Sequence, residues 1–234
     1  MRILEMYTYA FFQTPTSPLK LPQGIRGSLE IISFQELSAL VEPDLKAEDL
    51  PDTDEKLMQA VLIHDQIICT VFNQTTLLPL RFGICFDSAT AICEHLALHQ
   101  QNYLQKLQQF QGKAEYCLQA VPLEPTPNTP TQTNPIDSLP QRGRDYFKAK
   151  KQLHQRQLEH QQQQTQEWQQ LVDTISQTYP ASRLADSQPS RERIYILIHQ
   201  TKELKLQEQL NQWQSQSHHW QLTLGDAIPP YHFL

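Results

Sequence analysis

Glycine is scarce in this chain, which has only 6 glycines among its 234 residues. Loops that cradle phosphate groups need closely spaced glycines, and neither G-x-G-x-x-G nor G-x-x-x-x-G-K occurs in the sequence. The sequence therefore gives no sign of a nucleotide-binding loop.

Positive charge is also in short supply, because 19 lysines and arginines stand against 25 aspartates and glutamates. A nucleic-acid backbone is bound by clustered surplus cations, so we expect no nucleic-acid partner. Long apolar runs are missing too, since no stretch approaches the roughly 18 apolar residues of a spanning helix. Residues 1–12 contain Glu5 and lack a small-residue cleavage site, so they do not resemble a signal peptide. We expect a soluble, cytoplasmic protein without membrane insertion.

The residue patterns of common catalytic and metal sites are absent as well. The four cysteines form no C-x-x-C pair and lie in apolar surroundings, which predicts reduced core residues: Cys69, Cys85, Cys93 and Cys117. His95 and His99 share one helix face, but the glutamate of an H-E-x-x-H site does not follow the first histidine. No G-x-S-x-G motif occurs. We predict no catalytic, cofactor-binding or metal-binding residue.

The first half of the chain, residues 1–112, predicts a mixed α/β domain. Aromatic and aliphatic residues predict strands over 3–12 and 29–32. Ser33 and Glu36 have the spacing of a capping box, which predicts a short helix through Val41. Amphipathic helices are predicted over 55–73 and 89–111, the second ending at Gly112. Between them lies an extended stretch over 77–86, in which Gly83 indicates a bulge or a close backbone approach.

The second half, residues 113–234, predicts a domain whose elements follow the order β, α, β, β, α, β. The strands are expected over 113–123, 183–186, 193–199 and 220–224, and the helices over 144–177 and 204–214. A proline-rich loop over 122–140 precedes the long helix. This order is typical of the ferredoxin-like fold, with the strand over 193–199, apolar on both faces, inside the sheet. We therefore expect an α+β protein whose second domain is ferredoxin-like with an extended helix insertion.

Glutamine supplies the polarity of the long helix, since many of the 34 glutamines of the chain lie between Gln152 and Gln170. A helix that is polar nearly all round is solvated or bridges to another protein. We interpret Glu167 as an ordinary surface charge, and His154, His160 and the His218–His219 doublet as solvated. Residues 142–151 at the helix start hold the one basic cluster, which opposes the helix dipole; solvation or an acidic partner surface could offset it.

Several stretches, in this order along the chain, resemble the GvpL/GvpF family of gas vesicle proteins. The opening strand carries Tyr7 and Tyr9, and the predicted helix with His64 runs into a leucine-proline-leucine, basic, phenylalanine-glycine signature. The residues of that signature include Pro79, Leu80, Arg81, Phe82 and Gly83. The long helix opens on Gly143, Arg144 and Tyr146, and the tail holds Pro229, Pro230, Tyr231 and Phe233. The family tail usually reads glycine-proline-tryptophan-proline-proline-tyrosine, and residues 226–228 replace its middle here.

The resemblance implies a non-enzymatic accessory or minor structural protein that is required for gas vesicle assembly within the cytoplasm. It implies as partners the small hydrophobic shell protein and other gas vesicle accessory proteins. The motif positions are expected to serve the structure or to contact a partner, and the length is more similar to the F branch than to the L branch.

A different class of function stays open on the residues alone. A ferredoxin-like scaffold unrelated to gas vesicles could bind a small molecule or act as an enzyme, using His64 together with Cys69. Bound metal or a ligand that raises the melting temperature would favour this alternative.

Overall fold

The computed structural model describes residues 5–51, 53–124, 144–188 and 190–234, which form two compact units. The first unit contains residues 1–115, 197–200 and 227–234, and the second contains residues 116–196 and 201–226. Residues 227–234, which we expected in the second domain, thus belong to the first compact unit. The division into domains 1–112 and 113–234 stays a prediction.

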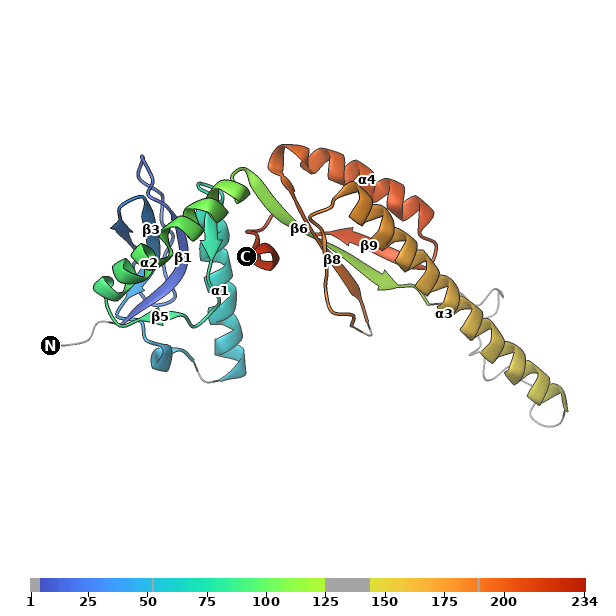
Figure 1. Ribbon diagram of the computed structural model, residues 1–234. Coiled ribbons are helices and arrows are strands. Elements are labelled where there is room, and N and C mark those ends of the chain that lie inside the picture. The colour runs from blue at the N-terminus through green and yellow to red at the C-terminus, as the bar shows by residue number, and fades with distance from the viewer. Residues whose placement is uncertain (1–4, 52, 125–143, 189) are drawn as a thin grey trace. The chain divides into compact units, whose positions relative to one another are not determined.

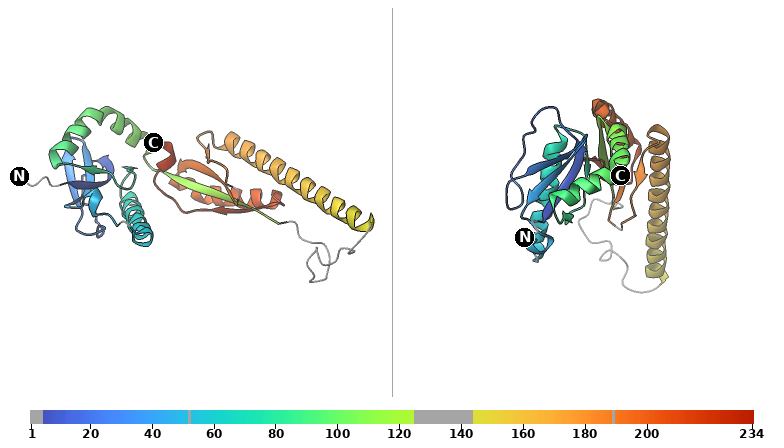
Figure 2. Two further views of the ribbon diagram at one scale, coloured as in Figure 1. Left: turned by 90° about the horizontal axis from the view of Figure 1, so that it is seen from below. Right: turned by 60° about the vertical axis from the view of Figure 1, so that its left-hand side comes forward.

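The first unit is built on an antiparallel sheet in the strand order β2-β3-β1-β4 (Figure 1). Its strands are β1 (Met6–Gln13), β2 (Glu30–Phe34), β3 (Leu37–Pro43), β4 (Leu77–Pro79) and β5 (Cys85–Phe86), which also pairs with β1. Helices α1 (Asp54–Phe72) and α2 (Ala89–Phe110) cover opposite faces of this sheet (Figure 2). Nearly every side chain of β1 is therefore buried.

The core between α2 and the sheet shows why this helix forms where its apolar spacing predicts. Ile92, Leu96 and Phe110 of α2 pack against Phe11 and Val41 of the strands. The Ser88 side chain accepts a hydrogen bond from the Ala91 N–H (3.1 Å) and caps the helix start. Gly112 follows the helix end at a positive φ of 69°, as expected for a residue that terminates a helix.

The short helix expected through Val41 is wrong, because residues 37–43 form strand β3. A two-residue turn at 35–36 joins β2 to β3, with Gln35 at a φ of 54°. β3 pairs with β1 on one side and β2 on the other, and its residues 37–42 are all buried. Tertiary pairing thus overrides a local capping pattern.

The extended stretch over 77–86 is two short strands, β4 and β5, separated by a turn at Phe82–Gly83. Gly83 has a φ of 90°, and a Cβ placed on it would meet no atom within 4 Å. The expectation of a bulge or close approach at Gly83 is therefore wrong. Glycine is needed there for its backbone conformation.

The second sheet has the strand order β7-β8-β6-β9. Its strands are β6 (Lys113–Pro122), β7 (Arg183–Leu184), β8 (Glu192–His199) and β9 (Trp220–Leu224), and its helices are α3 (Arg144–Thr178) and α4 (Glu203–Gln216). Taken in chain order from β6 to β9, these elements follow the ferredoxin-like order β, α, β, β, α, β. β8 lies between two strands, as its apolar residues on both faces predict. The α+β fold class is thereby confirmed.

The two halves of α3 differ in burial. Leu171 and Ile175 of the second half are buried, and the Trp168 ring lies 5.5 Å from that of Trp220. In the first half Phe147 keeps 71% of its surface exposed. Three short 3-10 turns complete the described chain: Ala47–Asp49, Gln200–Lys202 and Tyr231–Phe233. Among the described residues, no helix combines the length and the apolar character needed to cross a membrane.

Candidate functional site

Four of the family-motif side chains come together on the α1 side of the first sheet. The Tyr9 ring stacks on His64 at 5.1 Å, and the Tyr7 ring lies edge-on to Tyr9 at 4.9 Å. Phe82 lies 5.9 Å from Tyr7 and 5.6 Å from His64. We call Tyr7, Tyr9, His64 and Phe82 the aromatic cluster. It joins β1, α1 and the turn after β4.

A series of hydrogen bonds determines which atoms of this cluster carry a proton. The Gly83 N–H donates to the Tyr7 hydroxyl (3.1 Å), which lies 2.9 Å from His64 Nδ1. The other ring nitrogen, Nε2, lies 3.2 Å from the carbonyl oxygen of Leu80. A carbonyl can only accept, so Nε2 carries the proton and Nδ1 accepts from Tyr7. Burial lowers the pKa of His64 and raises the pKa of Tyr7, so both stay neutral.

Glu42 on β3 continues the hydrogen-bond network beyond the aromatic cluster, and its side chain is fully buried. Its Oε2 accepts from the Tyr9 hydroxyl (2.5 Å) and the Ile25 N–H (2.8 Å). Its Oε1 accepts from the N–H groups of Arg26 (2.6 Å) and Gly27 (2.5 Å). Burial, together with the bond to this carboxylate, raises the pKa of Tyr9 and keeps it a donor. Successive backbone N–H groups that converge on one anion thus shape the loop before β2.

Gly24 is required by this carboxylate. A Cβ on Gly24 would lie 2.4 Å from Glu42 Oε2 and 2.8 Å from the carbonyl oxygen of Gly27. A Cβ on Gly27 would lie 3.6 Å from Glu42 Oε1, an ordinary contact. The role of Glu42 was not predicted. The available signal is one charged residue between the apolar run over residues 39–41 and Pro43.

The tail motif is held against the first unit by a second buried carboxylate, that of Glu115. It accepts from the His232 N–H (2.9 Å), and its other oxygen lies 2.6 Å from His232 Nδ1. The backbones of Glu115 and Ile228 exchange two hydrogen bonds of 2.9 Å. The Tyr231 hydroxyl donates to Asp65 (2.7 Å), which follows His64 on α1.

The other motif residues do not join the aromatic cluster as side chains. Pro79 is buried in β4 opposite Ala10, and Arg81 is exposed. Pro229 and Pro230 are buried in the tail, and Phe233 packs against the core that contains Phe11. Arg144 is the first residue of α3, and the Tyr146 ring lies 5.7 Å from Phe147. Gly143 and most of the proline-rich loop lie outside the described residues.

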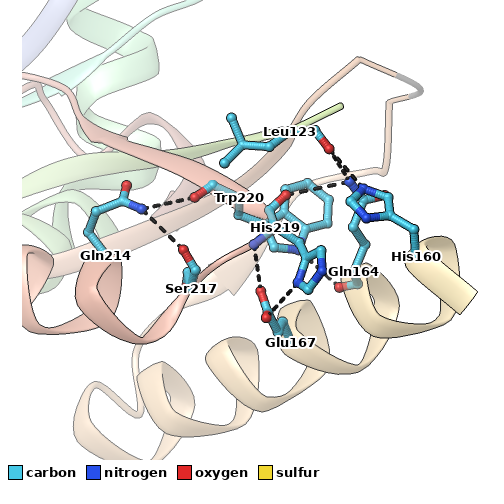
Figure 3. A network of polar contacts seen from close by, with 8 residues as sticks. All are labelled: Leu123, His160, Gln164, Glu167, Gln214, Ser217, His219 and Trp220. Carbon is cyan, nitrogen blue, oxygen red and sulfur yellow. Dashed lines mark hydrogen bonds and ion pairs between the residues drawn. The ribbon is translucent and has the colours of Figure 1, made fainter. Parts of the chain in front are cut away.

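From His160 onward, α3 is tied by polar contacts to Leu123, just after β6, and to His219 and Trp220 at the start of β9 (Figure 3). Glu167 accepts from the His219 N–H (3.0 Å) and lies 2.7 Å from His219 Nδ1. The Trp220 indole N–H donates to the carbonyl of Gln164 (2.9 Å). Gln164 Nε2 and His160 Nε2 reach the Leu123 carbonyl at 2.9 and 3.0 Å. We call these five side chains the α3 clasp: His160, Gln164, Glu167, His219 and Trp220.

The interpretation of Glu167, His160 and His219 as solvated surface groups is therefore wrong. Burial alone would raise the pKa of Glu167, but the hydrogen bonds from His219 lower it overall. The glutamine-rich stretch is thus partly structural. Sequence periodicity missed it because the contacts are made by polar side chains and backbone carbonyls, which leave no apolar stripe.

The basic end of α3, formed by Lys148, Lys150 and Lys151, is exposed next to Phe147. Among the described residues, no acidic group forms an ion pair with these three lysines. Within the described residues, these three lysines therefore add no ion pair to the second unit, whereas Glu167 of the α3 clasp pairs with His219.

The His64 and Cys69 pair of the alternative function is not formed. The His64 ring is fully engaged by Tyr7 and Leu80, whereas Cys69 Sγ lies 4.0 Å from Asp65. Burial raises the pKa of Cys69 to about 11, so its thiol is a poor nucleophile. His95 Nε2 lies 2.8 Å from the Tyr103 hydroxyl. Within the part of the chain that the structure describes, no group of three or more His, Cys, Asp or Glu residues could hold a metal ion.

Comparisons with known proteins agree with this architecture. A family model described as gas vesicle synthesis protein GvpL/GvpF matches residues 5–234. No curated protein sequence matches the chain significantly. The crystal structure of GvpF from Anabaena sp. PCC7120 is similar with a TM-score of 0.72 and 15% identity, over 98% of this chain and 95% of that chain. GvpF from Microcystis aeruginosa gives a TM-score of 0.70 and 15% identity, over 99% of each chain. The structures share the fold, and since the family model spans nearly the whole sequence, this chain belongs to the GvpL/GvpF family of gas vesicle synthesis proteins.

Proposed function

We propose that this chain is a non-enzymatic accessory or minor structural protein that is required for gas vesicle assembly. It acts by binding the small hydrophobic shell protein or another gas vesicle accessory protein in the cytoplasm, at the forming vesicle. The family match over residues 5–234 carries this proposal. The length and the two GvpF structures favour the F branch.

The basic end of α3 is the surface that we propose for partner binding. Lys148, Lys150 and Lys151 are exposed, and Phe147 keeps 71% of its surface in solvent. Three exposed lysines close in sequence to an exposed aromatic side chain form a surface that suits an acidic or mixed protein surface. The aromatic cluster, in contrast, is occupied by internal contacts, so its residues serve the fold.

The partner-binding role is tested by co-purification with the shell protein. Deleting α3 would remove Leu171 and Ile175 from the core, so charge reversal is the better variant. The variant Lys148→Glu/Lys150→Glu/Lys151→Glu is compared with Lys56→Glu/Lys202→Glu/Lys205→Glu, which changes the same charge at exposed lysines elsewhere. We expect the first to reduce capture roughly ten-fold and the second to leave it unchanged. Equal capture by both variants would remove the basic end from the interface.

The assembly role is tested separately in cells that make gas vesicles. Deletion of the gene is expected to abolish buoyancy, and the wild-type chain supplied in trans is expected to restore it. Buoyant cells after deletion would show that the chain is not required for assembly, whatever it binds.

A further inference from the structure

β9 is an outer edge of the second sheet, because within the described residues it pairs only with β6. The Gly225 N–H donates to the Cys117 carbonyl (2.9 Å), and the Leu123 N–H donates to the His219 carbonyl (2.8 Å). Residues 219 and 225 thus direct backbone groups toward β6. The alternation of a strand then directs those of Trp220 and Leu222 away from β6. An edge of this kind is a template for a further strand.

The Gln214 side chain of α4 covers this edge (Figure 3). Its Oε1 accepts from the Leu222 N–H (2.7 Å), and its Nε2 donates to the carbonyls of Trp220 (2.9 Å) and Ser217 (3.3 Å). A side-chain amide has the carbonyl and N–H of a peptide group. Gln214 therefore makes the bonds to Trp220 and Leu222 that a neighbouring strand would make.

The other edges of the two sheets are protected by ordinary means. β4, β5 and β7 are only three, two and two residues long, and β2 carries Glu30. Short length and charge both discourage pairing between edges. β9 has five residues, Trp220–Leu224, none of them charged. β9 has neither kind of protection, and among the described residues the Gln214 side chain occupies the backbone groups of Trp220 and Leu222 at this edge.

We infer that the β9 edge is a self-association surface, on which a second copy of this chain replaces the Gln214 amide. The two β9 strands pair antiparallel about a two-fold axis at Leu222, so that Trp220 faces Leu224 and Gln221 faces Thr223 of the other copy. Trp220 and Leu222 are buried on one face of the sheet, and Gln221 and Thr223 are exposed on the other. Apolar residues thus meet apolar residues, uncharged polar residues meet each other, and no like charges are opposed. Two-fold pairing with a second copy requires this self-complementarity, and β9 has it.

Sedimentation equilibrium of the full chain tests the role of Gln214. Gln214→Ala is expected to lower the dimer dissociation constant roughly ten-fold or more. In the wild-type chain, each copy must break the hydrogen bonds between Gln214 and β9 before the two strands can pair, whereas the variant has no such bonds to break. Gln212→Ala is the control, since Gln212 is exposed on the same helix and is expected to leave dimerisation unchanged. If Gln214→Ala disturbs the circular dichroism spectrum, Gln214→Leu replaces it with a side chain of similar size. A Gln214 variant that folds and dimerises no better than wild type would overturn the inference.

The strand register is tested by two charge patterns on the exposed face of β9, each combined with Gln214→Ala. Gln221→Lys with Thr223→Lys places introduced lysines opposite each other across the two-fold axis, so we expect the dimer to weaken. Gln221→Lys with Thr223→Glu places opposite charges there, so we expect the dimer to be restored. A dimer with the same dissociation constant for both patterns would show that the copies join elsewhere.

Discussion

Each of the two units contains a polar network, and the two networks differ in their distance from water. In the first, Glu42 is fully buried and His64 keeps 4% of its surface exposed. In the second, the Glu167 and His219 side chains keep 20% and 21%. A buried polar group that loses its partner cannot bond to water instead, whereas a partly exposed group can. We therefore expect the loss of a partner in the first network to lower the free energy of unfolding more than the loss of a partner in the second.

The largest expected effect comes from removing the centre of the buried network. Glu42→Ala leaves three backbone N–H groups and the Tyr9 hydroxyl without their acceptor. We expect it to lower the free energy of unfolding of the first unit by about 3 kcal/mol or more. Urea unfolding followed by circular dichroism measures this loss. Glu30→Ala, at an exposed position of β2, is the control and should change it by less than about 0.5 kcal/mol.

A steric test of the same network compares two glycines of one loop. Gly24→Ala places a Cβ 2.4 Å from Glu42 Oε2, whereas Gly27→Ala places one 3.6 Å from Oε1. We expect the first variant to cost about 2 kcal/mol of unfolding free energy and the second to be nearly neutral. Equal losses for the two variants would show that Glu42 does not determine the path of this loop.

The pH dependence of the first unit gives a smaller effect. Burial holds the pKa of His64 below its ordinary value of 6.5, so the unfolded chain takes up a proton first as the pH falls. Its contribution to stability is therefore full above this pH and is lost as the pH falls below it. We expect His64→Gln to reduce the change in the urea midpoint between about pH 7.5 and about pH 5.5. His154→Gln, at an exposed position of α3, should keep the wild-type change.

The smallest effect is expected in the α3 clasp. Glu167→Gln keeps one acceptor for His219 and loses the other, so we expect a cost of about 1 kcal/mol to the second unit. Thermal unfolding compares it with Glu159→Gln, where the exposed Glu159 bonds only to Gln155 among the described side chains. A larger loss for Glu167→Gln than for Glu42→Ala would reverse the contrast between the two networks.

The sequence predicts the elements that depend on apolar spacing and misses the contacts that depend on polar groups. The positions of α2 and β8 are predicted correctly from their apolar residues, because the buried face of a helix or strand requires apolar residues at regular intervals. The sequence predicts a helix in place of β3, because Ser33 and Glu36 have the spacing of a helix cap. Leu37 and Ala39 instead pair with β1, which the local sequence does not show. The sequence gives no role for Glu42 and the wrong one for Glu167, because their donors are backbone groups and residues far away in the chain. Of the family-motif positions, only Tyr7, Tyr9, His64 and Phe82 lie together in the aromatic cluster.

The path of the chain also has a consequence for its synthesis. Residues 227–234 complete the first unit, but they leave the ribosome after the whole of the second unit. Phe233 then packs against the core that contains Phe11 and Leu197, and His232 reaches Glu115. The core of the first unit therefore stays incomplete until residues 227–234 have been synthesised. A nascent chain truncated before residue 227 lacks these residues of the first unit.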